Sequence, residues 1–232
     1  GEPTVHPKFW EIMDLAKTKS IKHLMLNTNG VKIAKDKRFA EKLASYMPDF
    51  EVYLQFDSLD PEILKTIRGE DLSDIRLKAI EHLNEFNLST TLVVTLQKGL
   101  NDHEIGKTIQ YALKQKCIRG VTFQPTQVAG RNVDFKPNTQ KITLTEVRRK
   151  IYEQSDVFTP EYLIPVPCNP DNLCMAYALK IQDEVFALTR WVNPQDILDN
   201  SKNTINYEHD ERLQQHFLDI FSTGISVDKV ED

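Results

Sequence analysis

Glu51-Val52-Tyr53-Leu54-Gln55-Phe56, followed by Asp57-Ser58 and Asp60-Pro61, is the stretch that decides the fold. The first six residues have the pattern of a strand, which Asp57-Ser58 closes. Asp60 is a preferred N-cap residue, and Pro61 suits the first position of a helix because its missing N–H has no partner there. We therefore expect a strand, a short loop and a helix that ends near residues 68–69.

The same strand-to-helix pattern recurs through the first half of the chain. Strands are expected to begin near residues 22, 51, 90 and 120, and a helical pattern follows each of them. Such alternation predicts an α/β fold of parallel strands with crossover helices. We expect a partial (β/α) barrel over residues 1–139. Residues 140–232 are expected to form a small C-terminal α+β extension, with a hairpin over 175–181 and 185–192 and a last helix over 209–221.

Polar residues gather where these strands are expected to end. In sheets of this class, ligands bind at the carboxyl ends of the strands. This position predicts a shared binding site. Its candidate residues, together with a loop arginine that follows the fourth strand, are Gly1, Glu2, Pro3, Asn27, Asn29, Asp57, Ser58, Gln97, Gln124 and Arg131.

The opening Gly1-Glu2-Pro3-Thr4 predicts a loop that receives an ammonium group. Glycine permits close approach of a ligand to the backbone, and Pro3 biases Glu2 toward an extended conformation. We expect Glu2 to present its carbonyl and its carboxylate outward as acceptors. The alternative is an ordinary turn before a helix that Pro7 begins.

Asp57 and Arg131 are two further candidate binding residues, and each could instead have a purely structural role. Asp57 can accept hydrogen bonds from two vicinal hydroxyls, as a ribose offers, and its replacement by alanine is then expected to change folding little. The alternative role of a helix cap is already taken by Asp60. Arg131 can hold a carboxylate or an anionic substrate, or it can pair with Asp134.

Composition limits the classes of function. The 232 residues are 40% hydrophobic and 27% charged, with a net charge of −5, which gives no sign of a nucleic-acid surface. No apolar run reaches the length of a membrane span, and we expect no signal peptide. Three cysteines do not make a disulfide framework, so we expect a reducing cytoplasm.

Several segments, in this order, resemble the radical S-adenosylmethionine (SAM) enzymes. They cover about residues 1–131: Gly1-Glu2-Pro3-Thr4, Leu26-Asn27-Thr28-Asn29-Gly30, Leu54 to Asp60 with Ile67-Arg68-Gly69, Gly99 to Asp102, and Pro125 with Gly130-Arg131. The resemblance implies a TIM-barrel-like, metal-binding oxidoreductase in which Glu2 holds the methionyl amino group of SAM. It also implies a 4Fe–4S iron–sulfur cluster that generates a 5′-deoxyadenosyl radical, and an electron donor such as flavodoxin or ferredoxin.

The substrate is expected to be a small molecule or cofactor. A Pro-Cys segment like the one near Cys168 occurs in some radical methylases that act on pterins or lipids, which suggests methylation. Two alternatives to an enzyme stay open: a non-catalytic SAM- or nucleotide-binding module, and an α/β domain whose strand-end polar residues are only caps.

The departure from the family concerns cysteines. The family holds its cluster with a CxxxCxxC loop upstream of the Gly-Glu-Pro segment, and this chain contains no such loop. We therefore expect a fragment that does not cleave SAM by itself. Cys117 is expected to be a core or surface thiol. Cys168 and Cys174 are candidate ligands of an auxiliary cluster, since thiolates suit iron and zinc, or else structural thiols beside the hairpin.

Overall fold

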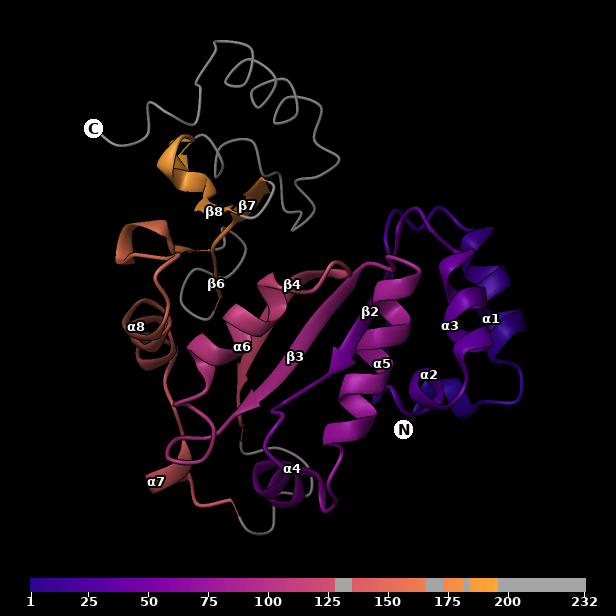
Figure 1. Cartoon of the computed structure of the whole chain (residues 1–232), viewed down its shortest axis with the longest axis horizontal. Helices are drawn as coiled ribbons and strands as arrows, with labels where there is room; N and C mark the ends of the chain where they lie inside the picture. The colour runs from indigo at the N-terminus through magenta and orange to yellow at the C-terminus, as the bar shows by residue number, and fades with distance from the viewer. Residues whose placement is uncertain (128–134, 166–172, 182–183, 196–232) are drawn as a thin grey trace. The chain divides into compact units, whose positions relative to one another are not determined.

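The computed structural model describes residues 1–127, 135–165, 173–181 and 184–195 of the chain. Its contacts divide the chain into two compact units, Gly1–Ser155 and Asp156–Asp232. Figure 1 labels their elements.

The first unit is built on one four-stranded parallel sheet. Its strands, in spatial order, are β1 (Leu24–Thr28), β2 (Phe50–Gln55), β3 (Thr90–Leu96) and β4 (Ile118–Pro125). The register pairs Thr28 with Leu54 and Thr95 with Gln124, so the four carboxyl ends lie along one edge. The predicted α/β class is confirmed, and the described strands do not close into a barrel.

Helices connect the strands, and local sequence signals set their ends. Asp60 accepts hydrogen bonds from the amides of Glu62 and Ile63, and Gly69, with φ 85°, ends the same helix. The helix that follows β3 begins only at Ile105, because residues 97–104 form a hydrogen-bonded loop. The helical elements are η1 (Pro3–Val5), α1 (Phe9–Lys17), α2 (Val31–Lys35), α3 (Lys37–Ala44), α4 (Pro61–Arg68), α5 (Ser73–Glu85), α6 (Ile105–Leu113), α7 (Pro137–Gln140) and α8 (Leu144–Gln154).

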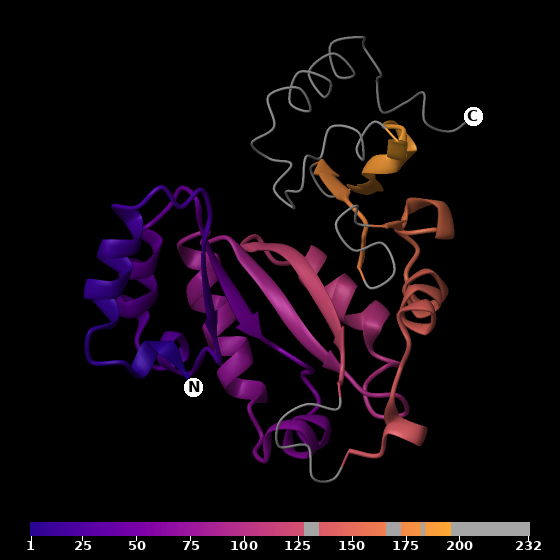
Figure 2. The same cartoon turned by 180° about the vertical axis from the view of Figure 1, so that it is seen from behind.

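The two faces of the sheet differ. Val52, Leu54 and Leu92 are fully buried on the face that carries α5 and α6. On the opposite face, Asn27 is exposed and Tyr53 is partly exposed. Figure 2 shows this second face from behind, and no described helix of the first unit covers it.

The second unit contains two short antiparallel pairs. β5 (Ile164–Pro165) pairs with β6 (Cys174–Met175), and β7 (Ala178–Ile181) pairs with β8 (Glu184–Ala187). The pairing of the predicted hairpin is confirmed, although β8 ends early because η3 (Leu188–Arg190) follows it. Its small core is made of Ile164, Leu188 and Val192 with Met175, Tyr177 and Leu179. The short helix η2 (Pro160–Tyr162) precedes β5 and contacts η3.

Three predictions are not decided by this fold. The helix expected over 209–221, Arg131 and Cys168 lie outside the described residues. The domain boundary expected at 139–140 stays a prediction. The compact units divide instead at Ser155, because α8 packs against α6 and thus belongs to the first unit. No helix in the described ranges is long and apolar enough to cross a membrane.

Candidate functional site

Glu2 joins the first loop to the end of β1. Its Oε1 atom accepts hydrogen bonds from the hydroxyls of Thr4 and Thr28, both at 2.7 Å, and from the Thr4 amide at 3.2 Å. Its Oε2 atom accepts a hydrogen bond from the Asn29 amide at 2.7 Å. The expectation that this carboxylate faces outward is therefore wrong, since both of its oxygens bind neighbouring residues of the chain.

The ionisation of Glu2 supports the same conclusion. Partial burial opposes the charge, but hydrogen bonds from the Asn29 amide and from Thr4 and Thr28 outweigh it and lower the pKa of Glu2. Glu2 is consequently an anion at neutral pH. Beside it, a Cβ atom at Gly1 would meet no atom within 4 Å, so the backbone there borders open space.

Arg76 of α5 connects the ends of β1 and β2. Its Nη1 atom donates to the Asn29 carbonyl, and its Nε atom donates to the Phe56 carbonyl at 3.4 Å. The residue is fully buried, and this burial lowers the pKa of Arg76 to about 10, which still leaves it cationic at neutral pH. Our sequence reading missed Arg76. The sequence does indicate it: Arg76 is a charged residue at helical spacing from apolar residues that are all buried, namely Leu72, Ala79, Ile80 and Leu83.

Asp57 lies directly after β2 with a left-handed backbone, φ 61°. Its side chain is fully buried, while that of Arg68 is 29% exposed. Arg68 donates to both carboxylate oxygens, from Nε at 2.7 Å and from Nη2 at 2.9 Å, and the Thr95 amide donates to Oδ1 at 3.0 Å. Such a bidentate pair fixes the loop after β2 against the end of β3.

This geometry corrects two expectations about Asp57. Its carboxylate has no exposed oxygen that a ribose could reach while the pair with Arg68 is intact. Its removal would also take away the acceptor of the Thr95 amide and both carboxylate bonds of Arg68, so we expect folding to be weakened. Ser58 is likewise buried, where it donates to Glu104 and accepts from the Asp60 amide at 2.9 Å.

Asn101 organises the loop between β3 and α6. Its side-chain amide donates to the Thr95 carbonyl at 2.8 Å and to the Asp57 carbonyl at 3.4 Å. Its Oδ1 atom accepts from the Gln97 amide at 3.0 Å. The sequence analysis includes Asn101 only as part of a segment that resembles the family. The local sequence pattern does not predict its hydrogen bonds to the backbone of the neighbouring strand.

Neutral polar side chains line the uncovered face of the sheet near the strand ends. Asn27 and Gln124 are exposed, and Gln124 donates to the Tyr53 hydroxyl at 3.3 Å. Gln55 and Thr95 share this face by strand alternation and register. The sequence reading missed Tyr53 and Gln55, although the alternation of apolar and polar residues over 50–55 indicates them. At the amino ends of the strands, His23 bonds Glu51 at 2.9 Å.

The described residues do not fit an iron–sulfur cluster. No group of three or more His, Cys, Asp or Glu among them is placed to hold a metal ion. Cys117 is fully buried, and this burial raises the pKa of its thiol to about 11, as suits a core residue. Cys174 lies in β6, whereas Cys168 is outside the described ranges, so their auxiliary site stays a prediction.

Comparison with known proteins places this geometry in a family. Residues 1–112 match the family profile described as the Radical SAM superfamily. The 7,8-dihydro-6-hydroxymethylpterin dimethyltransferase of Methanocaldococcus jannaschii is 36% identical over 171 residues, which are 72% of this chain and 33% of that protein. A probable GTP 3′,8-cyclase of Thermococcus kodakarensis is 36% identical over 118 residues, 51% of this chain and 37% of that protein.

A third relative is the mycofactocin maturase MftC of Mycolicibacterium smegmatis, which is 26% identical over 156 residues, 66% of this chain and 37% of that protein. The chain thus spans about a third of the length of the curated relatives that it matches. Through residues 1–112, the chain belongs to the radical SAM superfamily.

Proposed function

We propose that the first unit is the SAM-binding part of a radical SAM enzyme, with SAM lying across the carboxyl ends of β1 to β4. The observation that carries this proposal is the meeting of Glu2, Asn29, Asp57 and Asn101 at one edge of the sheet, linked by hydrogen bonds and lying within the residues that match the family.

The strand-end residues are proposed to act in two ways. Gly1, Pro3 and the carbonyl of Glu2 border the methionyl amino group, while the Glu2 carboxylate holds the loop in place. The side chains of Asn29, Asp57 and Ser58 fix the edge from within, because each already bonds the protein. The residues proposed to reach SAM or the substrate by their side chains are Asn27, Gln97, Gln124 and Arg131.

The 4Fe–4S cluster is proposed to have its main ligands outside this chain. When bound, it would supply the electron that cleaves SAM to a 5′-deoxyadenosyl radical, and a flavodoxin or ferredoxin would supply that electron in turn. A reducing cytoplasm is the proposed compartment, since clusters and free thiols persist there. The residues described here contribute binding, orientation and the shape of the sheet.

For the reaction, we propose methylation of a small uncharged heterocyclic substrate. The relative named as a pterin dimethyltransferase aligns with 171 residues of this chain, whereas the one named as a GTP cyclase aligns with 118. The uncovered face offers Asn27, Tyr53 and Gln124, which are neutral donors and acceptors. Such groups suit the ring edges of a pterin-like compound better than they suit a triphosphate.

The experiment uses the intact protein that contains this chain, purified without oxygen and reduced with dithionite. SAM binding together with release of 5′-deoxyadenosine would support the enzyme. SAM binding without 5′-deoxyadenosine, from a protein whose preceding sequence has no CxxxCxxC loop, would favour the non-catalytic module. Absence of SAM binding would refute the proposal. This chain alone, reconstituted with iron and sulfide, is expected to release no 5′-deoxyadenosine.

A further inference from the structure

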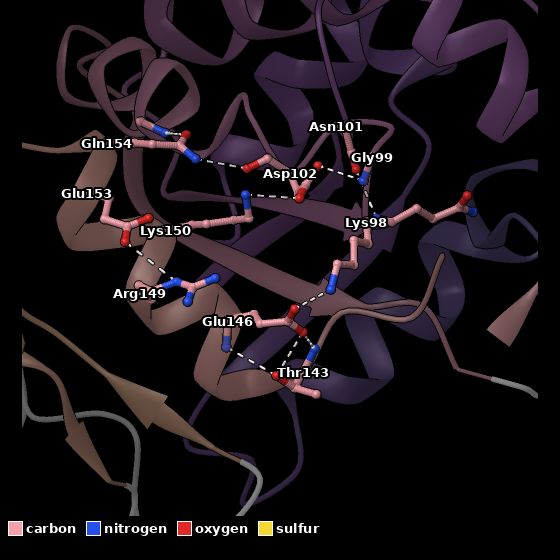
Figure 3. A network of polar contacts seen from close by, with 12 residues as sticks. Lys98, Gly99, Asn101, Asp102, Thr143, Glu146, Arg149, Lys150, Glu153 and Gln154 are labelled. Atoms are coloured by element: carbon pink, nitrogen blue, oxygen red, sulfur yellow. Dashed lines mark hydrogen bonds and ion pairs between the residues drawn. The ribbon is translucent and has the colours of Figure 1, made fainter. Parts of the chain in front are cut away.

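Helix α8 is bound by polar side chains to the loop that follows β3, as Figure 3 shows. This loop, residues 97–104, carries Gln97 and Asn101 of the candidate site. Lys150 and Gln154 of α8 both point at Asp102, which lies in the middle of the loop. These contacts are separate from the packing of α8 on α6, and they lead directly to the strand ends.

The strongest contact is an ion pair between Lys150 and Asp102. The Nζ atom of Lys150 lies 3.1 Å from Oδ2 of Asp102, with side chains that are 24% and 9% exposed. The other oxygen of Asp102 accepts a hydrogen bond from the Gly99 amide at 2.9 Å. Since both oxygens are engaged, Asp102 transmits the position of α8 to the backbone of the loop.

Gln154 adds a second bridge one turn further along the helix. Its Nε2 atom donates to the Asp102 carbonyl at 3.0 Å, and its Oε1 atom accepts from the Gly106 amide at 3.1 Å. A Cβ atom at Gly106 would lie 1.9 Å from the Gln154 carbonyl oxygen. Only glycine therefore lets the first turn of α6 approach α8 this closely.

The start of α8 is bound to the same loop. Glu146 forms a capping box with Thr143, and it also receives an ion pair from Lys98. The Lys98 amide donates to the Gln140 carbonyl at 2.9 Å. Because both ends of α8 contact residues 97–104, the helix cannot shift along its axis without moving the loop.

The loop in turn holds the strand ends. Asn101 donates to the carbonyls of Thr95 and Asp57, and Glu104 accepts from Ser58. A continuous chain of contacts thus runs from Lys150 through Asp102 and Asn101 to the ends of β2 and β3. The backbone joins Asp102 to Asn101, and the other links are hydrogen bonds or an ion pair between buried or partly buried groups, where such contacts are least screened by solvent.

We propose that Lys150 and Gln154 are positioning residues for the SAM site: by holding Asp102 they keep residues 97–101 in the conformation that binds SAM. This inference rests on the proposed function. Neither residue is expected to contact SAM itself. Their loss should free the loop while the sheet and its core stay folded, since α8 also packs on α6 and its Val147 is buried.

The test compares Lys150→Met, Lys150→Arg and Arg149→Met in the intact protein. Lys150→Met keeps the apolar stem and removes the ion pair, whereas Lys150→Arg can re-form it. Arg149→Met is the matched control, because within the described part of the chain Arg149 forms its ion pair with Glu153, at 3.5 Å, and both side chains are 54% exposed. Asp102→Asn also removes the ion pair with Lys150, and it keeps an acceptor for the Gly99 amide.

Two readouts are measured: hydrogen exchange of the amides of residues 97–101, and the SAM dissociation constant from calorimetry. Lys150→Met and Asp102→Asn should speed exchange in this loop and weaken SAM binding about tenfold, within the range for residues that act through others. Lys150→Arg should restore both, and Arg149→Met should change neither. Unchanged SAM affinity in Lys150→Met and Asp102→Asn, with a wild type that binds SAM, would overturn the inference. A wild type without SAM binding would instead overturn the proposed function, and the inference with it.

Discussion

Asp57 gives the sharpest test of what the strand-end residues do. Replacing it with asparagine keeps the shape of the side chain, tolerates the left-handed φ of 61° and leaves an acceptor for the Thr95 amide. What is lost is the charge that faces Arg68. Because the Arg68 side chain is 29% exposed, it can turn partly to water, so we expect a loss of about 2 kcal/mol of unfolding free energy.

Asp57→Ala should cost more, for two additional reasons. The Thr95 amide loses its acceptor, which costs about 1 kcal/mol for a partly buried donor. Alanine also has no local hydrogen bond to favour a left-handed backbone, which adds about 1 kcal/mol. The total of about 4 kcal/mol falls in the range measured when one partner of a buried ion pair is removed.

Urea unfolding of the wild type and both variants measures these differences, and calorimetry with SAM separates them from binding. We expect the order wild type, Asp57→Asn, Asp57→Ala, with a gap of about 2 kcal/mol between the two variants. Equal stability of all three proteins, together with weaker SAM binding by Asp57→Asn, would refute the positioning role. That result would restore Asp57 as a direct ribose ligand.

Three further predictions concern other parts of the first unit. Hydrogen bonding by Lys98, with that of Thr143, lowers the pKa of Glu146 from 4.5 to about 2. The ionised Glu146 side chain therefore stabilises the fold fully above about pH 4.5, and this stabilisation is lost as the pH falls toward 2. The urea midpoints of the wild type and of Glu146→Gln should converge over that pH range. Gly106→Ala should lower the thermal midpoint and speed exchange in α8, because its methyl group would collide with the Gln154 carbonyl; an unchanged midpoint would contradict the close approach. Arg76→Met should destabilise the protein by about 2 kcal/mol, since it removes the Nη1 donor of the Asn29 carbonyl and one donor of the Phe56 carbonyl, which also accepts from the Ser58 amide at 2.8 Å. Circular dichroism melts would show this loss, and a loss below 1 kcal/mol would contradict the role given to Arg76.

The order of elements could be predicted because local signals specify it. Asp60-Pro61 begins α4 and Gly69 ends it, and Thr143 with Glu146 caps α8. The four strands stand out as apolar runs between such signals. What could not be predicted from local patterns is α2, whose five residues follow a left-handed Gly30 and are too few to show a helical period.

The meeting of the strand-end candidate residues at one edge was predictable, but the contacts of their side chains were not. Parallel strands bring their carboxyl ends to one edge, so Asn29, Asp57 and Gln97, which follow β1, β2 and β3, were expected at the same edge. Whether a carboxylate faces a ligand or the protein depends on partners distant in sequence. Thr28 and Arg68 satisfy Glu2 and Asp57 respectively, and no spacing along the chain indicates those pairs.

Deuterium uptake of the intact protein, compared with and without SAM, tests the central claim most directly. If SAM lies across the carboxyl ends of the sheet, its addition should slow exchange at residues 1–4, 27–30, 57–58 and 97–101. Exchange near His23 and Glu51, at the opposite ends of the strands, should not change. Protection confined to that opposite end, or no protection in a protein saturated with SAM, would contradict the assignment of this edge as the cofactor site.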